Sequence, residues 1–205
     1  LKQDENRMYE NKKKKNKSLK NDELKVLLTT LKEKSHETEK HARRLQKMSI
    51  ILGSKMNLNS YKLNKLKLLS SLHDIGKTVI PEQLLSKPGD LTESEWELIK
   101  EHSEKGYRII SSTEEFAHIA EDILYHHEHW DGNGYPEGLK GEEIPLLARI
   151  IAIVDAFDVM IHGRNYKESM TMTAAVKELD RCAGTQFDPD IVDTFIKSVK
   201  ENEIH

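Results

Sequence analysis

The sequence lacks the features that mark several common classes of protein. It has a single cysteine, Cys182, in 205 residues, which excludes a disulfide framework and is typical of a reducing cytosol. No apolar run approaches the roughly 20 residues that a membrane-spanning helix needs. Acidic and basic residues number 35 and 32, for a formal charge of −3, so the chain lacks the basic excess of a protein that binds a nucleic-acid polymer.

The first residues are polar, and the chain opens with Leu1 rather than Met. We therefore expect part of a longer protein that lies in the cytoplasm, either alone or as the cytoplasmic part of a sensor, with no membrane contact of its own. Residues 1–20 are rich in Lys and Asn, which is typical of a solvated lead-in. The lysine run at 12–15 fits a linker, with contact to anionic lipid or nucleic acid as the alternative.

An apolar stripe at three- and four-residue steps runs from Leu24 to Leu52. It predicts one long helix through most of 20–56, although Lys34 interrupts it. Two weak heptads near 20–34 also fit a parallel coiled coil that would join two copies of the chain. We predict a helical linker over residues 1–33 and one domain over residues 34–205.

The later segments keep a helical pattern. Capping-box spellings at Thr92–Glu95 and Ser112–Glu115 precede apolar-periodic runs, and Pro81 and Pro189 occupy first-turn positions. The apolar run at 146–157 has the length of a buried helix and no turn signal inside it. The fold class predicted is all-α.

Imidazoles and carboxylates fall on or beside the apolar stripes of five predicted helices. Unpaired buried charge is costly, and a divalent cation compensates several carboxylates at once. The pattern therefore predicts a metal centre. Its candidate ligands are His41, His73, Asp74, His102, His126, His127 and Asp155.

The adjacent pairs His73-Asp74 and His126-His127 favour two ions over one. Neighbours on a helix diverge by about 100°, so each pair can reach two ions that lie side by side, with a carboxylate between them. Two ions about 3.5 to 4 Å apart suit phosphoester hydrolysis, because they lower the pKa of a bridging water and hold the attacking and leaving oxygens. Ligation without cysteine favours Fe, Mn, Zn, Co or Ni and does not choose among them.

Spacing adds two candidates. Glu37 precedes His41 by four residues and shares its helix face, so it is either the ligand of a third ion or an ordinary solvated glutamate. Lys77 follows Asp74 by three residues. It is either a surface lysine or an ammonium that meets a phosphate oxygen or protonates a leaving alkoxide.

Residues 126–136 read HHEHWDGNGYP. The stretch lacks the spacing of a zincin helix, has Pro136 where a calcium loop needs Gly, and misses the dinucleotide-loop glycine spacing by one residue. We interpret Glu128 and His129 as lying on the outer side of a helix. Trp130 then packs the helix end, and the turn that follows stops the helix and presents Tyr135.

Six segments carry a specific likeness: HETEKHARR at 36–44, HDIGK at 73–77, IPEQLLSKPGDLTESEW at 80–96, HHEHWDGNGYPEGLKGEEIPLLARIIAIVDAFDVM at 126–160, RNYK at 164–167 and GTQFDP at 184–189. Together they resemble the HD-GYP domains, a bacterial branch of the HD metal-dependent phosphohydrolases. The resemblance implies a helical bundle that hydrolyses cyclic di-GMP to pGpG, and often on to GMP, with two or three ions, most often Fe or Mn. It also implies attack on phosphorus by a hydroxide that bridges the metals.

The resemblance also assigns roles by position. It implies Asp74 as a bridging ligand, Lys77 as the catalytic lysine, and Tyr135, Arg164 and Lys167 as contacts of the dinucleotide. The implied metal ligands are Glu37, His41, His73, Asp74, His102, His126, His127 and Asp155.

Two departures from the family pattern stand out. Ser103 replaces a usual Pro, and residues 161–163 read IHG where Thr-Ser and a polar residue are usual, which places His162 near the substrate lobe. Two rival functions stay open. One is a non-hydrolysing receptor or adaptor that binds the dinucleotide or a diguanylate cyclase. The other is an HD hydrolase of another cyclic dinucleotide, such as a hybrid one.

Overall fold

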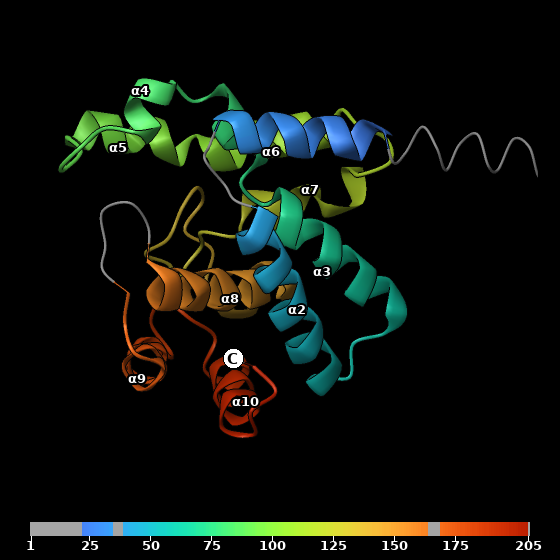
Figure 1. Cartoon of the computed structure of the whole chain (residues 1–205), viewed down its shortest axis with the longest axis vertical. Helices are drawn as coiled ribbons and strands as arrows, with labels where there is room; N and C mark the ends of the chain where they lie inside the picture. The colour runs from blue at the N-terminus through green and yellow to red at the C-terminus, as the bar shows by residue number, and fades with distance from the viewer. Residues whose placement is uncertain (1–21, 35–38, 164–168, 205) are drawn as a thin grey trace, which may run out of the picture.

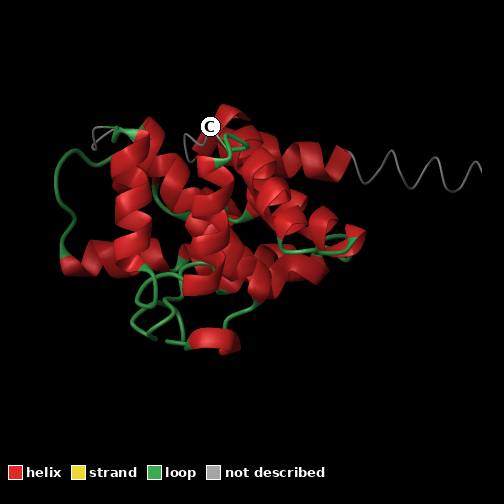
Figure 2. Ribbon diagram, turned by 90° about the horizontal axis from the view of Figure 1, so that it is seen from below, coloured by secondary structure: helices red, strands yellow, loops and turns green. Residues whose placement is uncertain are grey.

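The computed structural model describes residues 22–34, 39–163 and 169–204. In these ranges the chain is helical and contains no β-strand (Figure 1; Figure 2), so the predicted all-α fold is confirmed. Across the same ranges, no helix has the length and apolar content to cross a membrane.

One helix covers residues 22–34, and the remaining elements follow in chain order. They are α2 (Glu39–Lys55), α3 (Ser60–Leu72), η1 (Ile75–Val79), α4 (Glu82–Leu85), α5 (Glu93–Lys100), α6 (His102–Ser111), η2 (Ala117–Ile119), α7 (Ala120–Leu124), η3 (Gly141–Glu143), α8 (Leu146–His162), α9 (Met172–Cys182) and α10 (Pro189–Lys200).

Helix α8 lies at the centre of the bundle. In Figure 1, α4, α5 and α6 lie on one side of it and α9 and α10 on the other. Its residues Ile150 and Val154 are fully buried against α2 and α3, whose Leu45, Leu52 and Leu66 are fully buried as well. The helix predicted from the apolar run at 146–157 is therefore present, and it is buried because helices cover it on several sides.

The single long helix predicted over 20–56 is wrong. Residues 22–34 and α2 are separate helices that run in different directions (Figure 1). Leu31 is buried in the core of the domain, so this part of the apolar stripe packs against the domain itself. An apolar stripe can keep its three- and four-residue spacing across two helices that run in different directions. Periodicity alone therefore does not distinguish one long helix from two shorter ones.

The capping signals gave mixed results. Thr92 and Glu95 form a complete capping box at the start of α5, and Pro189 occupies the first turn of α10. Pro81 directly precedes α4. The helix start predicted at Ser112 is wrong, because Ser112 follows the end of α6 and its hydroxyl donates to a carbonyl of that helix.

The backbones of η1 and α6 approach each other closely at Gly76. A Cβ atom added there would lie 1.8 Å from the carbonyl oxygen of His102 and 2.6 Å from the backbone nitrogen of Gly106. Only glycine permits this approach. It brings the segment that contains Asp74 directly against the first residue of α6.

We predict that Gly76→Ala destabilises the fold by about 3 kcal/mol, because backbone atoms on both sides must move apart. Gly184→Ala is the matched control: Gly184 has a φ of 78° and no neighbour within 4 Å of an added Cβ, so only backbone strain of about 1 kcal/mol is expected. Urea unfolding of the metal-free proteins measures both. A loss at Gly76 no larger than the loss at Gly184 would contradict the close approach.

Candidate metal centre

The ligand atoms of seven predicted residues gather into two clusters, in each of which they lie within 4.8 Å of one another. The first cluster contains Asp74, His102, His126 and His127, and the second contains His41, His73 and Asp155. The structure thus brings together every predicted metal ligand that lies in its described ranges.

Most of these candidate ligands lie at or just after the ends of helices. His73 and Asp74 occupy the junction between α3 and η1, and His102 is the first residue of α6. His126 and His127 follow α7, which ends at Leu124. The expectation that both histidines project from a helix is therefore wrong, and a turn presents them instead.

Asp74 lies between the two clusters. Its Oδ1 is 3.3 Å from Nε2 of His102 and 3.9 Å from Nε2 of His126. Its Oδ2 is 3.3 Å from Nε2 of His73 and 2.5 Å from Nζ of Lys77. Each oxygen faces a different cluster, and a carboxylate that bridges two ions requires this arrangement.

Backbone carbonyls fix the orientation of two imidazoles in the first cluster. Nδ1 of His102 donates to the carbonyl oxygen of Ile99 (2.7 Å), and Nδ1 of His126 donates to that of Ile123 (2.6 Å). A carbonyl oxygen only accepts, so Nδ1 carries the proton in each neutral ring and Nε2 keeps its lone pair. Both lone pairs are then available to a metal ion near Asp74.

Burial sets the charge states in the first cluster. It lowers the pKa of His126 to about 3 and lowers the pKa of His127 well below its usual value, so both imidazoles are neutral. Burial acts to raise the pKa of Asp74, but the charges of Lys77 and His73 outweigh it and hold that pKa well below its ordinary value.

A charged carboxylate beside imidazole nitrogens is a donor set that suits a divalent transition-metal ion. The buried Oδ1 of Asp74 accepts no hydrogen bond among the described residues, so an anionic oxygen faces the first cluster without a proton donor. The residues therefore fit a divalent ion.

Asp158 supports the second cluster, and sequence reasoning missed it. Its carboxylate accepts a 2.7 Å hydrogen bond from Nδ1 of His41 and two hydrogen bonds from Arg44, at 2.5 and 2.7 Å. Asp158 is 1% exposed. Two spacings in the sequence could have indicated this role: Asp158 follows Asp155 by one helical turn, and Arg44 follows His41 by three residues. His162 also adjoins Asp158, with Nδ1 3.3 Å from the carboxylate.

We predict that Asp158→Asn lowers metal affinity at the second cluster about 10- to 100-fold. Asn presents one acceptor oxygen and an amide donor where Asp158 presents two acceptors, so His41 and Arg44 cannot both be satisfied. Competition with a chelator, followed by metal analysis, measures the effect. Asp193→Asn, which removes an exposed ion pair with Lys197, is the control, and equal metal retention in both variants would contradict the role of Asp158.

The loop that carries Tyr135 is tied to the first cluster. The Tyr135 ring stacks on His127, with centroids 4.9 Å apart and planes at 26°, and its backbone N–H donates to the His127 carbonyl. Burial raises the pKa of Tyr135, so its hydroxyl stays protonated. The predicted substrate residue Tyr135 therefore lies against a candidate metal ligand, and its protonated hydroxyl can donate a hydrogen bond.

The interpretation of Glu128 as an outward-facing residue is wrong. Glu128 is 3% exposed, and its carboxylate accepts backbone N–H groups of Glu137, Gly138 and Leu139 at 2.7, 3.0 and 3.1 Å. These three residues directly follow the Tyr135-Pro136 pair. One buried carboxylate thus holds the loop in place, a role that shows no spacing pattern in the sequence.

Trp130 and Asp131 bind the chain before α10 rather than the end of a helix. Their backbone N–H groups donate to the carbonyls of Gln186 and Thr185, and Arg149 lies 5.7 Å from the Trp130 ring. The turn at 131–136 therefore does not stop a helix, because α7 has already ended at Leu124.

Some residues predicted from the sequence are not described by the structure, and others lie outside the two clusters. Glu37, Arg164 and Lys167 lie outside the described residues. His118 is exposed, and His129 belongs to neither cluster.

Residues 25–191 match the HD domain family. The chain belongs to the HD domain family. A cyclic di-GMP phosphodiesterase of Thermotoga maritima is 37% identical to this HD domain over 180 residues, which cover 87% of this chain and 49% of that protein. A 3'3'-cGAMP-specific phosphodiesterase 2 of Vibrio cholerae is 35% identical over 173 residues, 83% of this chain and 33% of that protein.

A solved structure agrees with the fold. The cyclic GMP-AMP specific phosphodiesterase of V. cholerae superposes with a TM-score of 0.66 at 24% identity, covering 86% of this HD domain and 47% of that chain. The family match and the two sequence relatives confirm the predicted relationship to HD-type phosphodiesterases. This HD domain spans between a third and a half of the length of these proteins.

Proposed function

We propose that this HD domain is a metal-dependent phosphodiesterase that hydrolyses cyclic di-GMP to pGpG and on to GMP. The observation that carries the proposal is the position of Asp74, whose two oxygens face two separate ligand clusters. The name of the T. maritima relative supports the substrate.

The proposed cofactors are two divalent ions, iron or manganese, one at each cluster, and a third ion if Glu37 is a ligand. When bound there, such ions would acidify a water molecule and neutralise charge on the scissile phosphate. His102, His126 and His127 would hold the ion at the first cluster, and His41, His73 and Asp155 the ion at the second.

Lys77 is proposed as the acid that assists the leaving group. Its ammonium lies 2.5 Å from Oδ2 of Asp74 in a side chain that is 13% exposed, so it lies directly beside the first cluster. From there it can donate to the departing ribose oxygen or to a phosphate oxygen. The protonated Tyr135 hydroxyl is proposed as a second hydrogen-bond donor. Arg164 is proposed to bind the phosphate through two hydrogen bonds of its planar guanidinium, and Lys167 through the positive charge of its ammonium.

The test is hydrolysis of cyclic di-GMP by protein purified without oxygen and loaded with Mn or Fe(II). We expect Asp74→Asn to reduce turnover about a hundredfold or more, because the carboxylate between the clusters is lost. Asp122→Asn is a matched control: Asp122 is also buried and pairs with a lysine, Lys65, at 2.9 Å, but it belongs to neither cluster. Its variant should keep normal turnover.

Two outcomes would redirect the proposal. Undiminished turnover by Asp74→Asn would exclude its bridging role. Binding of cyclic di-GMP without turnover by the wild type in either metal would favour the receptor or adaptor function. Because one relative is named for 3'3'-cGAMP, that hybrid dinucleotide is the second candidate substrate, and a higher kcat/KM for it than for cyclic di-GMP would replace the first.

The third ion has its own prediction. If Glu37 is a ligand, the metal count per chain should fall from near three toward two in Glu37→Ala, because a carboxylate ligand is lost. Glu39→Ala removes a nearby exposed glutamate that pairs with Arg43 and should leave the count unchanged. Metal analysis of the desalted proteins decides, and equal counts in both variants would remove Glu37 from the ligand set.

The remaining proposals concern partners and location. The helix over 22–34 exposes 64% of Val26, which favours a homodimer through the N-terminal helices. A diguanylate cyclase stays the second protein partner proposed, and the cytoplasm the proposed location.

A further inference from the structure

Helix α5 is firmly held although it buries none of its own side chains. The capping box of Thr92 and Glu95 fixes its start, and Lys87 forms a 2.6 Å ion pair with Glu95 from the preceding loop. Yet Trp96 and Leu98 are 43% and 45% exposed. The fold thus fixes a helix that leaves an indole ring open to solvent.

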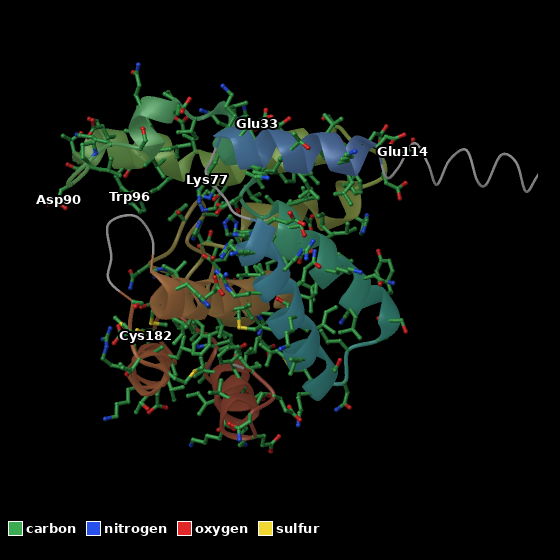
Figure 3. The ribbon with its side chains drawn as sticks, viewed as in Figure 1. Glu33, Lys77, Asp90, Trp96, Glu114 and Cys182 are labelled. Carbon is green, nitrogen blue, oxygen red and sulfur yellow. The ribbon has the colours of Figure 1, made fainter. Side chains whose placement is uncertain are left out.

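Trp96 extends the row of rings that begins at the first cluster. Its ring meets the edge of Tyr135 at a centroid distance of 6.4 Å and 81°, and Tyr135 itself stacks on His127. The ammonium of Lys100, also on α5, lies 5.7 Å from the centroid of the Tyr135 ring. In Figure 3, Trp96 and Lys77 lie on the same side of the upper helices, below α5 and α6 in this view. The Tyr135 ring therefore lies between the indole and His127 of the first cluster, and Trp96 belongs to neither cluster.

We propose that Trp96 stacks on a purine base of the cyclic dinucleotide while the scissile phosphate lies at the metal clusters. The inference rests on the proposed function and adds a recognition element to it. A nucleotide extends from its phosphate through the ribose to the base, so a base must lie outward from the clusters, where Trp96 stands. An exposed indole face gains contact area and π-stacking when a base covers it.

Stacking also defines what Trp96 contributes to specificity. Every base has a π-face, so stacking on an indole increases the affinity for either purine and does not discriminate between guanine and adenine. Trp96 thus supplies affinity for a purine cyclic dinucleotide, whether cyclic di-GMP or the hybrid.

The same helix offers a matched control. Leu98 has nearly the exposure of Trp96, but two residues along a helix turn it by about 200°, onto another face. Both side chains are exposed, so Trp96→Ala and Leu98→Ala should both fold, and their metal content should equal that of the wild type.

The experiment compares Trp96→Ala, Trp96→Phe and Leu98→Ala on cyclic di-GMP with Mn. We expect Trp96→Ala to raise KM about tenfold with little change in kcat, and to weaken calorimetric binding equally. Trp96→Phe should recover most of the loss, and Leu98→Ala should match the wild type. An unchanged KM and Kd in Trp96→Ala, or an equal effect of Leu98→Ala, would overturn the proposal.

The two proposals fail differently. If the wild type does not hydrolyse cyclic di-GMP, the proposed function fails, and the calorimetric Kd of Trp96→Ala for the same dinucleotide still tests stacking. If the wild type hydrolyses it and Trp96→Ala behaves like Leu98→Ala, only the stacking fails.

Discussion

The buried carboxylate of Asp74 is the constraint on which the rest of the structure depends. An isolated charge in a protein interior is strongly disfavoured, so the fold must bring compensating groups to it from several elements. The glycine at position 76 lets α6 approach closely enough to place His102 beside one oxygen, and Lys77 reaches the other from the same short segment. Under the proposed function, a metal ion at each cluster would complete this compensation.

A second set of contacts orients the side chains of the two clusters. Backbone carbonyl oxygens accept hydrogen bonds from Nδ1 of His102 and His126 and fix the orientation of their rings. The Asp158 carboxylate does the same for His41. Glu128 fixes the loop beyond Tyr135 through three backbone N–H groups. Such contacts fix ring orientation before any ion binds, which reduces the ordering that binding requires.

The sequence predicted the all-α class and the seven residues that the structure gathers into the two clusters, because histidines and aspartates on or beside apolar stripes stand out in the sequence. It did not predict Glu128 or Asp158 as supports. Glu128 binds backbone groups and Asp158 binds side chains far along the chain, so helical periodicity alone does not identify either contact. The end of α7 at Leu124 was missed for a related reason: the His126 ring takes the Ile123 carbonyl, an acceptor that a continuing helix would use itself.

The most direct test of this account is electron paramagnetic resonance of the Mn(II)-loaded protein, because two ions that share one carboxylate are magnetically coupled. The account predicts an exchange-coupled signal in the wild type that is replaced by signals of uncoupled Mn(II) in Asp74→Asn. An uncoupled, mononuclear signal from fully loaded wild-type protein would contradict the placement of Asp74 between two ions.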